Sequence, residues 1–185
     1  MTNFTLRKAT RNDEQALATL AYNTYYRRFF CLKTLGRDGK PYGGPLGKEF
    51  PELLKGQTQE SFEDYWAKFI PGVFSPNPTD ANYCFVAENG RGQIIGFVKG
   101  NGKPVDSASA DQAQTSSAST AELGSLYINF DYQQSFAGRL LTQVYARQMA
   151  CLGYKALVTR AYDKNDSVFF FQKMGATNRG RCLHP

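Results

Sequence analysis

A polar turn at residues 129–135, together with the residues that follow it up to 139, carries residue types that suit anion binding. An apolar run ending at Ile128 precedes it and apolar residues at helical spacing follow it, so a buried strand is predicted to run directly into an amphipathic helix. The first backbone N–H groups of a helix lack intrahelical partners and lie at the positive end of the helix dipole, which suits a pyrophosphate. Gly138 lets the main chain approach a ligand closely, and Arg139 adds a positive charge. The sequence therefore predicts an anion site at residues 133–139.

The predicted site and the strand before it resemble part of a known family. The segments ELGSLYI, residues 122–128, and YQQSFAGRLL, residues 132–141, are similar to the strand and the pyrophosphate loop of the GNAT superfamily of N-acetyltransferases. The family's loop usually reads Gln/Arg-x-x-Gly-x-Gly/Ala before a helix. Gln133, Gly138 and the following Arg-Leu-Leu match this pattern. Phe136 stands where the inner glycine would be, and Gln134 replaces another common glycine, so the loop is a degenerate copy.

Two further segments match the family in the correct order. The run CFVAENGRGQIIGFVKG, residues 84–100, resembles its central hairpin. The run YKALVTRAYDKNDSVFFFQKMGAT, residues 154–177, resembles its next strand and helix, although Phe171 occupies a position where many members carry tyrosine. The resemblance implies an α/β fold with a mixed, mostly antiparallel central sheet and helices on both faces, formed by one acyl-CoA N-acyltransferase domain over residues 1–185.

The family's chemistry is transfer of an acetyl or other acyl group from its coenzyme A thioester to a primary amine, by direct attack in a ternary complex. The resemblance places the pantetheine arm of acetyl-CoA along the strand before the turn, the pyrophosphate on the loop, and the lower arm beside the last helix. The residues so assigned to acetyl-CoA are Leu126, Tyr127, Ile128, Gln133, Gln134, Ser135, Phe136, Ala137, Gly138, Arg139, Asn165 and Phe171.

Acyl transfer needs a neutral amine, a donor that polarises the thioester carbonyl and a route for protonating the thiolate. An ordinary amine has a pKa of about 10.4 and arrives charged, so a base is required. Glu122 is the first choice, with an exposed strand-end carboxylate as the alternative interpretation, and the N–H of Ile128 is the expected carbonyl donor. Phe171 cannot donate a proton, so Tyr162, Ser167 or water is expected to act as the acid.

A second hypothesis is a GNAT-fold module that binds acyl-CoA as a sensor or regulator without efficient turnover. It rests on Phe171, on Phe136 and on a short C-terminal region, where only one strand, near residues 177–183, is available instead of the family's two. That edge of the sheet could be covered in a homodimer. The identity of the amine acceptor does not follow from these residues.

The remaining elements follow from local patterns. Residues 4–8 favour a strand, and residues 10–13 form a capping box that opens a helix with Leu17, Leu20, Ala21 and Tyr25 on its buried face. After a long loop at residues 31–57, an aromatic helix face spans residues 62–70 and is expected to end at Pro71-Gly72. This face is either core or a wall of the acceptor pocket, which Tyr25, Tyr42 and Phe50 could also line.

Two strands, at residues 82–88 and 93–99, are expected to form a hairpin through the turn Asn89-Gly90-Arg91-Gly92, followed by a flexible excursion over residues 101–119. In the helix after the loop, the expected buried face consists of Phe136, Leu140, Val144 and Tyr145, with Ala137, Leu141 and Met149 beside it.

Composition limits the other classes of function. With 185 residues and 42% hydrophobic content, the chain suffices for one core. It has no apolar run long enough for a membrane span, and its first residues lack a signal segment, so a cytoplasmic protein without a membrane partner is expected. The net charge of +6 attracts anions without choosing among them, and no motif indicates nucleic acid. Four scattered cysteines and a single histidine give no pattern for a metal site.

Overall fold

The computed structural model describes residues 3–30, 56–74, 82–104, 120–161 and 167–178. The described residues form a five-stranded sheet in the order β1-β2-β3-β4-β5. Neighbouring strands from β1 to β4 are antiparallel, and β5 is parallel to β4. The strands are β1 (Phe4–Lys8), β2 (Asn82–Asn89), β3 (Ile94–Pro104), β4 (Thr120–Ile128) and β5 (Ala156–Val158).

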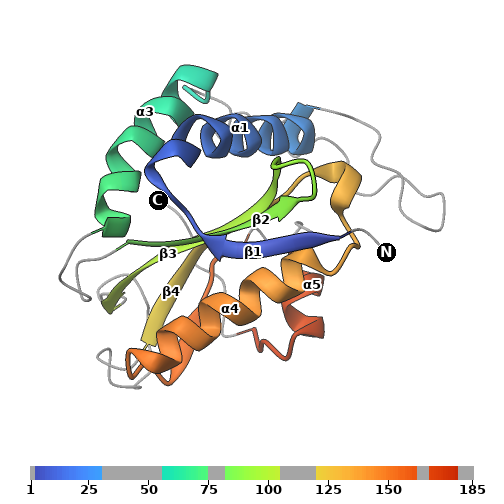
Figure 1. Ribbon diagram of the computed structural model, residues 1–185. Coiled ribbons are helices and arrows are strands. Elements are labelled where there is room, and N and C mark those ends of the chain that lie inside the picture. The colour runs from blue at the N-terminus through green and yellow to red at the C-terminus, as the bar shows by residue number, and fades with distance from the viewer. Residues whose placement is uncertain (1–2, 31–55, 75–81, 105–119, 162–166, 179–185) are drawn as a thin grey trace.

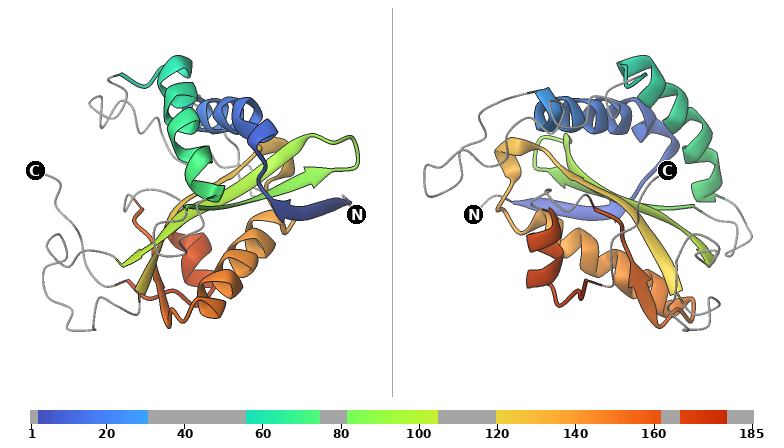
Figure 2. Two further views of the ribbon diagram at one scale, coloured as in Figure 1. Left: turned by 60° about the vertical axis from the view of Figure 1, so that its left-hand side comes forward. Right: turned by 180° about the vertical axis from the view of Figure 1, so that it is seen from behind.

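Helices cover both faces of this sheet, so the predicted fold class is confirmed. Figure 1 shows α1 and α3 on one face and α4 and α5 on the other, and the two further views in Figure 2 agree. The α-helices are α1 (Glu14–Phe30), α3 (Gln59–Phe69), α4 (Ala137–Cys151) and α5 (Ser167–Lys173), and the short 3-10 helices are η1 (Arg11–Asp13), η3 (Ile70–Phe74) and η6 (Phe130–Tyr132).

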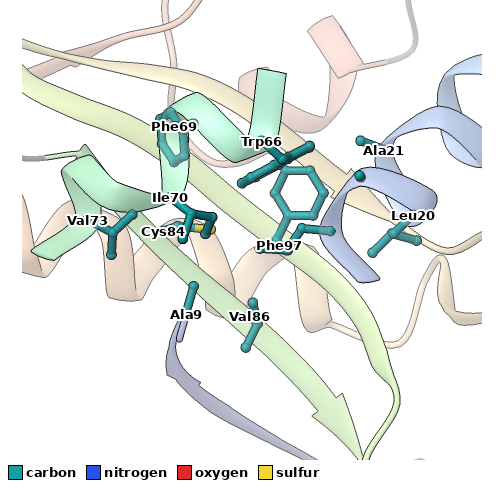
Figure 3. Close-up of a cluster of buried hydrophobic side chains, with 12 residues drawn as sticks. Ala9, Leu20, Ala21, Trp66, Phe69, Ile70, Val73, Cys84, Val86 and Phe97 are labelled. Atoms are coloured by element: carbon teal, nitrogen blue, oxygen red, sulfur yellow. The ribbon is translucent and has the colours of Figure 1, made fainter. Parts of the chain in front are cut away.

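The core has two parts because successive side chains of a strand point to opposite faces. On the face toward α1 and α3, Phe97 packs against Trp66 with ring centroids 5.0 Å apart (Figure 3). On the other face, Val98 belongs to a second cluster with Leu141 and Tyr145 of α4. Adjacent residues of β3 therefore hold the two helical layers on one sheet.

The start of α1 is fixed by the predicted capping box. The backbone N–H of Thr10 donates to Asp13 Oδ2 at 2.6 Å, and η1 leads directly into α1. Arg7 connects this corner to the sheet, because its guanidinium donates to Asp13 at 2.7 Å and to Glu88 at 2.8 Å.

Several predicted boundaries differ from the structure. Helix α3 ends at Phe69, close to the predicted end at Pro71-Gly72, but a 3-10 helix, η3, continues to Phe74; proline is tolerated near the start of a helical segment, where its missing N–H costs little. Strand β3 reaches Pro104 by pairing with β4, so part of the expected excursion is strand. The rest of the excursion, at 105–119, and the C-terminal residues from 179 onward lie outside the described residues.

The buried face of α4 also differs from the prediction. Its buried residues are Ala137, Leu141, Thr142, Tyr145 and Met149, whereas the side chain of Phe136 is 69% exposed and Leu140 is exposed as well. The backbone of Phe136 is left-handed, with φ of 65°, so this residue precedes the helix and its ring does not continue the helical stripe. The buried positions 137, 141 and 145 thus each lie one residue after the predicted positions 136, 140 and 144.

Candidate functional site

Strand β4 pairs with β5 only along its first three residues, because β5 ends at Val158. The two strands pair only at Thr120 with Ala156, Ala121 with Leu157 and Glu122 with Val158, whereas β4 continues to Ile128. An extra residue at Gly124 shifts the register of β4 against β3, since Ser125 pairs with Lys99 but Leu123 pairs with Gly100. Beyond Glu122, the edge of β4 that faces β5 therefore takes no further part in their pairing.

The polar turn after β4 adopts the backbone of a glycine loop without its glycines. Gln134 and Phe136 both have positive φ, at 73° and 65°. These are the two positions at which the family's loop commonly has glycine and this chain has another residue. A left-handed conformation is costly for side chains such as these, so the surrounding structure must hold it in place.

Side-chain contacts hold the turn at its base. Gln133 Nε2 donates to the carbonyl of Ile128 at 3.4 Å, and Ser135 Oγ donates to the carbonyl of Tyr132 at 2.6 Å. These contacts connect the loop to the end of β4 and to η6.

The N-terminus of α4 opens directly onto this loop. The backbone ladder starts with the N–H of Leu140 donating to the carbonyl of Phe136 at 3.0 Å, and no described side chain caps the helix. The N–H groups of Ala137, Gly138 and Arg139 therefore precede the ladder and are available to an anion. Arg139 is exposed and adds positive charge near this end of the helix.

Gly138 lies where α4 meets β4 and α5. An added Cβ would be 3.5 Å from Ile128 and from the ring of Phe170, which is ordinary contact. The position therefore accepts a small side chain but has no room for a large one.

Leu126, Tyr127 and Ile128 form the end of β4 and are half-buried. Leu126 and Ile128 pack toward α4, whereas Tyr127 lies on the opposite face, 5.3 Å from the ring of Phe97. The same strand end thus contributes to both sides of the sheet.

Glu122 has a fixed environment. Its Oε1 accepts from Arg160 Nη1 at 3.2 Å, and its backbone carbonyl accepts from the hydroxyl of Tyr145 at 2.6 Å. Burial raises the pKa of Tyr145, so this hydroxyl stays protonated and donates. The carboxylate is half-buried and not simply an exposed strand end.

The other predicted catalytic residues are only partly described. Ser167 is the first residue of α5 and is half-buried. Phe171 packs against the core cluster on the α4 face, with its ring 5.1 Å from that of Phe170. Tyr162 and Asn165 lie outside the described residues, as do Tyr42 and Phe50.

A hollow of about 370 Å³ lies on the other face of the sheet, between α1, α3, β3 and β4. The aromatic side chains in its wall come from α1, α3 and the two strands, and they are Tyr25, Phe62, Tyr65, Trp66, Phe97 and Tyr127. Gln57, Ser61, Ser125 and Lys99 add polar groups. The aromatic face of α3 is therefore both core and pocket wall, because Trp66 is buried while Tyr65 is partly exposed.

Lys99 is the pocket residue that the sequence interpretation missed. Its Nζ donates to the hydroxyl of Tyr65 at 2.6 Å and lies 4.6 Å from the centre of the same ring. Burial lowers the pKa of Lys99 to about 8. The charges of Cys84 and Glu122 act in the opposite direction, but their effect is smaller. The available signal was a lysine two residues after Phe97 in an apolar strand, which places both on one face.

Two other kinds of site find no support. The part of the chain that the structure describes has no group of three or more side chains that could hold a metal ion. None of its described helices has the length and apolar character needed to cross a membrane.

A sequence profile described as the acetyltransferase (GNAT) family matches residues 47–176 of this chain. No curated protein sequence is significantly similar to it. Among similar solved structures is an aminoglycoside N-acetyltransferase in complex with CoA, at 11% identity and a TM-score of 0.67, covering 100% of this chain and 95% of that one.

Two further structures resemble the whole chain. A transcriptional regulator from Bacillus halodurans C-125 has 16% identity and a TM-score of 0.61, with 99% of each chain covered. Glucosamine-6-phosphate N-acetyltransferase from Arabidopsis thaliana has 10% identity and a TM-score of 0.59, covering 99% of this chain and 97% of that one. At identities this low, the structural matches show a shared fold and nothing more.

Proposed function

Because the chain belongs to the acetyltransferase (GNAT) family, we propose that it is an N-acetyltransferase that transfers an acetyl group from acetyl-CoA to a primary amine of a small molecule or a protein. The amine attacks the thioester carbonyl directly while both substrates are bound. One domain over residues 1–185 carries both substrates.

The observation that supports this proposal is that β4 continues beyond its pairing with β5 and then leads through the turn into an uncapped helix N-terminus. The open edge of β4 offers backbone donors and acceptors to an extended amide-containing arm, and the turn at Gln133–Arg139 offers N–H groups to a pyrophosphate. Acetyl-CoA has both features and supplies an activated acyl group. The chain's residues thus fit this co-substrate.

In the proposed reaction, Glu122 accepts a proton from the acceptor amine, directly or through water. Its ion pair with Arg160 keeps the carboxylate oriented, and the hydroxyl of Tyr145 fixes the backbone that carries it. The N–H of Ile128 polarises the acyl carbonyl. Ser167, Tyr162 or water protonates the departing thiolate, since Phe171 has no proton to give.

The first experiment is a calorimetric titration with acetyl-CoA and, separately, with CoA. Gly138→Trp should abolish binding, because the α4 start is in contact with Ile128 and Phe170 and has no room for an indole. Gly90→Trp is the matched control, since a side chain at this exposed hairpin position meets no atoms within 4 Å. Absence of acetyl-CoA binding to the unmodified protein would refute the proposal.

A second candidate is a module that binds acyl-CoA without efficient turnover. The specific observation in its favour is Phe171, which packs as an apolar residue in the region where the family often has tyrosine. Phe171→Tyr distinguishes the two. A large gain in the rate of acetyl transfer would identify the natural chain as catalytically impaired, whereas an unchanged, substantial rate would identify another acid.

A further inference from the structure

The wall of the hollow between α1 and α3 is rich in aromatic side chains and, among the described residues, carries a single charged one. Its six aromatic side chains offer a large apolar wall, and Trp66 and Phe97, both buried, form its deepest contacts with the core. Lys99 is the one charged side chain among the described lining residues. An occupant of this pocket therefore meets apolar surface and a single positive charge.

Among the described residues, the ammonium of Lys99 makes no salt bridge; the carboxylate of Glu122, which is paired with Arg160, acts on it only as a nearby charge. Tyr65 accepts one hydrogen bond from it, and the rings of Tyr65 and Phe69 lie 4.6 and 5.0 Å away. Aromatic rings attract a cation, but they compensate little of the cost of removing it from water. A primary ammonium has three donors, so two remain for a ligand.

An anionic group would relieve this deficit, and a second cation would increase it. A carboxylate matches the single charge of Lys99 and can accept both remaining hydrogen bonds. A polycationic acceptor such as a polyamine would meet like charge and no described carboxylate in the pocket wall.

We propose that this pocket binds an amine acceptor with an apolar, aromatic-sized body and a carboxylate, and that Lys99 binds the carboxylate. The assignment of the occupant as acceptor rests on the proposed acetyl transfer. Lys99 is then a specificity-determining residue, distinct from the base that deprotonates the amine.

Binding to the pocket has a built-in reporter, because Trp66 is the only tryptophan in the chain and lines the hollow. We would titrate the protein with 3-phenylpropionate and with phenethylamine, which share an apolar body and carry opposite charges, and follow Trp66 fluorescence. The carboxylate should bind about tenfold more tightly, as expected for a charge-assisted hydrogen bond in a half-buried site.

Three variants locate the effect. Lys99→Met should remove the preference for the carboxylate while keeping the volume of the side chain, and Lys99→Arg should retain most of it. Lys68→Met removes the same charge from an exposed position on α3 outside the pocket wall and should change nothing. Equal binding of the two probes, no response to either, or a preference that survives in Lys99→Met would overturn the inference.

The result for the carboxylate probe can be told apart from the result of the acetyl-CoA titration that tests the proposed function. Failure of acetyl-CoA to bind would refute acetyl transfer even if the carboxylate probe binds at Lys99. If acetyl-CoA binds, phenylalanine should be acetylated with a higher kcat/KM than phenethylamine, and Lys99→Met should lower only the former. An equal fall in kcat for both amines would make Lys99 a base instead and contradict its role in specificity.

Discussion

At the scale of single residues, the loop after β4 shows how a backbone conformation can survive a change of residue type. Gln134 and Phe136 adopt the positive φ that glycine adopts freely. The side chain of Phe136 is mostly exposed, so it recovers little apolar burial in return. The conformation is therefore maintained by the helix that follows and by the contacts of Gln133 and Ser135.

We expect Phe136→Gly to stabilise the protein by about 1 kcal/mol, because it removes left-handed strain at a position with little packing to lose. Chemical denaturation with a fluorescence readout measures this change. Gln133→Gly is the matched control, since Gln133 has an ordinary φ of −61° and should gain nothing. A loss of stability in Phe136→Gly would show that the phenyl ring contributes to the fold.

Glu122 is the residue on which the proposed chemistry depends. Glu122→Gln keeps the shape of the side chain but removes the base, so kcat should fall roughly a hundredfold while acetyl-CoA affinity is unchanged. Steady-state kinetics and calorimetry measure the two effects separately. Glu60→Gln, at an exposed position on α3, should leave both unaltered. If Glu122→Gln retains nearly full kcat, the proton is taken up elsewhere.

At the scale of elements, β4 organises the site because it changes partner along its length. Its first residues pair with β5, its whole length pairs with β3, and its end leads into the loop and α4. Tyr145 of α4 fixes the strand at Glu122, and Gly100 of β3 lies directly beneath that contact. Helix α4 therefore anchors β4 at Glu122, the last residue of β4 that pairs with β5.

Gly100→Ala should destabilise the protein by about 1–3 kcal/mol, since its Cβ would overlap the Tyr145 hydroxyl and the Glu122 carbonyl. Gly124→Ala, on the facing strand, would place its nearest contact at 3.6 Å and should change stability by less than about 1 kcal/mol. Denaturation midpoints of the two variants give the comparison. Equal stability of the two proteins would show that β3 and α4 can move apart at this point.

At the scale of the whole molecule, the sheet separates two proposed binding functions. Helices α4 and α5 lie on one side of the sheet and α1 and α3 on the other (Figure 2). The turn proposed for acetyl-CoA leads into α4, and the aromatic pocket proposed for the acceptor is lined by residues of α1, α3, β3 and β4. The two sides meet at the end of β4, where Ile128 and Tyr127 point to opposite faces. Both substrates can therefore reach one strand end without competing for surface.

The charge of Lys99 predicts a pH dependence of ligand binding. Burial lowers its pKa to about 8, so the ammonium is present below that pH and is lost as the pH rises through it. Facing it are Tyr65 from α3 and Cys84 from β2, whose pKa values burial raises to about 12, and the Glu122 carboxylate from β4. Between pH 7 and 9 we therefore expect the change at Lys99 to dominate the carboxylate affinity.

Fluorescence titrations with 3-phenylpropionate should show an affinity that is constant near pH 6.5 and falls by about tenfold in total as the pH rises through 8 and Lys99 loses its charge. Lys99→Arg should give a flat profile over this range, since its guanidinium stays charged. A wild-type profile as flat as that of the arginine variant would mean that Lys99 does not titrate here.

The order of the elements could be predicted from the sequence through local signals, namely the spacing of apolar residues, the capping box at Thr10 and the turn at Asn89-Gly90. The fold class and the role of the loop were predicted from the resemblance to the GNAT family. The replacement of glycine at Gln134 and Phe136 was visible in the sequence, but the positive φ of both residues was seen only in the structure.

Which side chains meet could not be predicted from the sequence, because their contacts join segments that are far apart along the chain. Glu122 and Arg160 are 38 positions apart, and the pocket joins Tyr25, Trp66 and Lys99 from three separate elements. The exposure of Phe136 likewise depends on where the helix begins, which a periodic pattern defines only to within a residue or two. The burial of a side chain and the charges around it arise from such non-local packing. For this reason Lys99, which the sequence interpretation missed, was proposed as the determinant of specificity only from the structure.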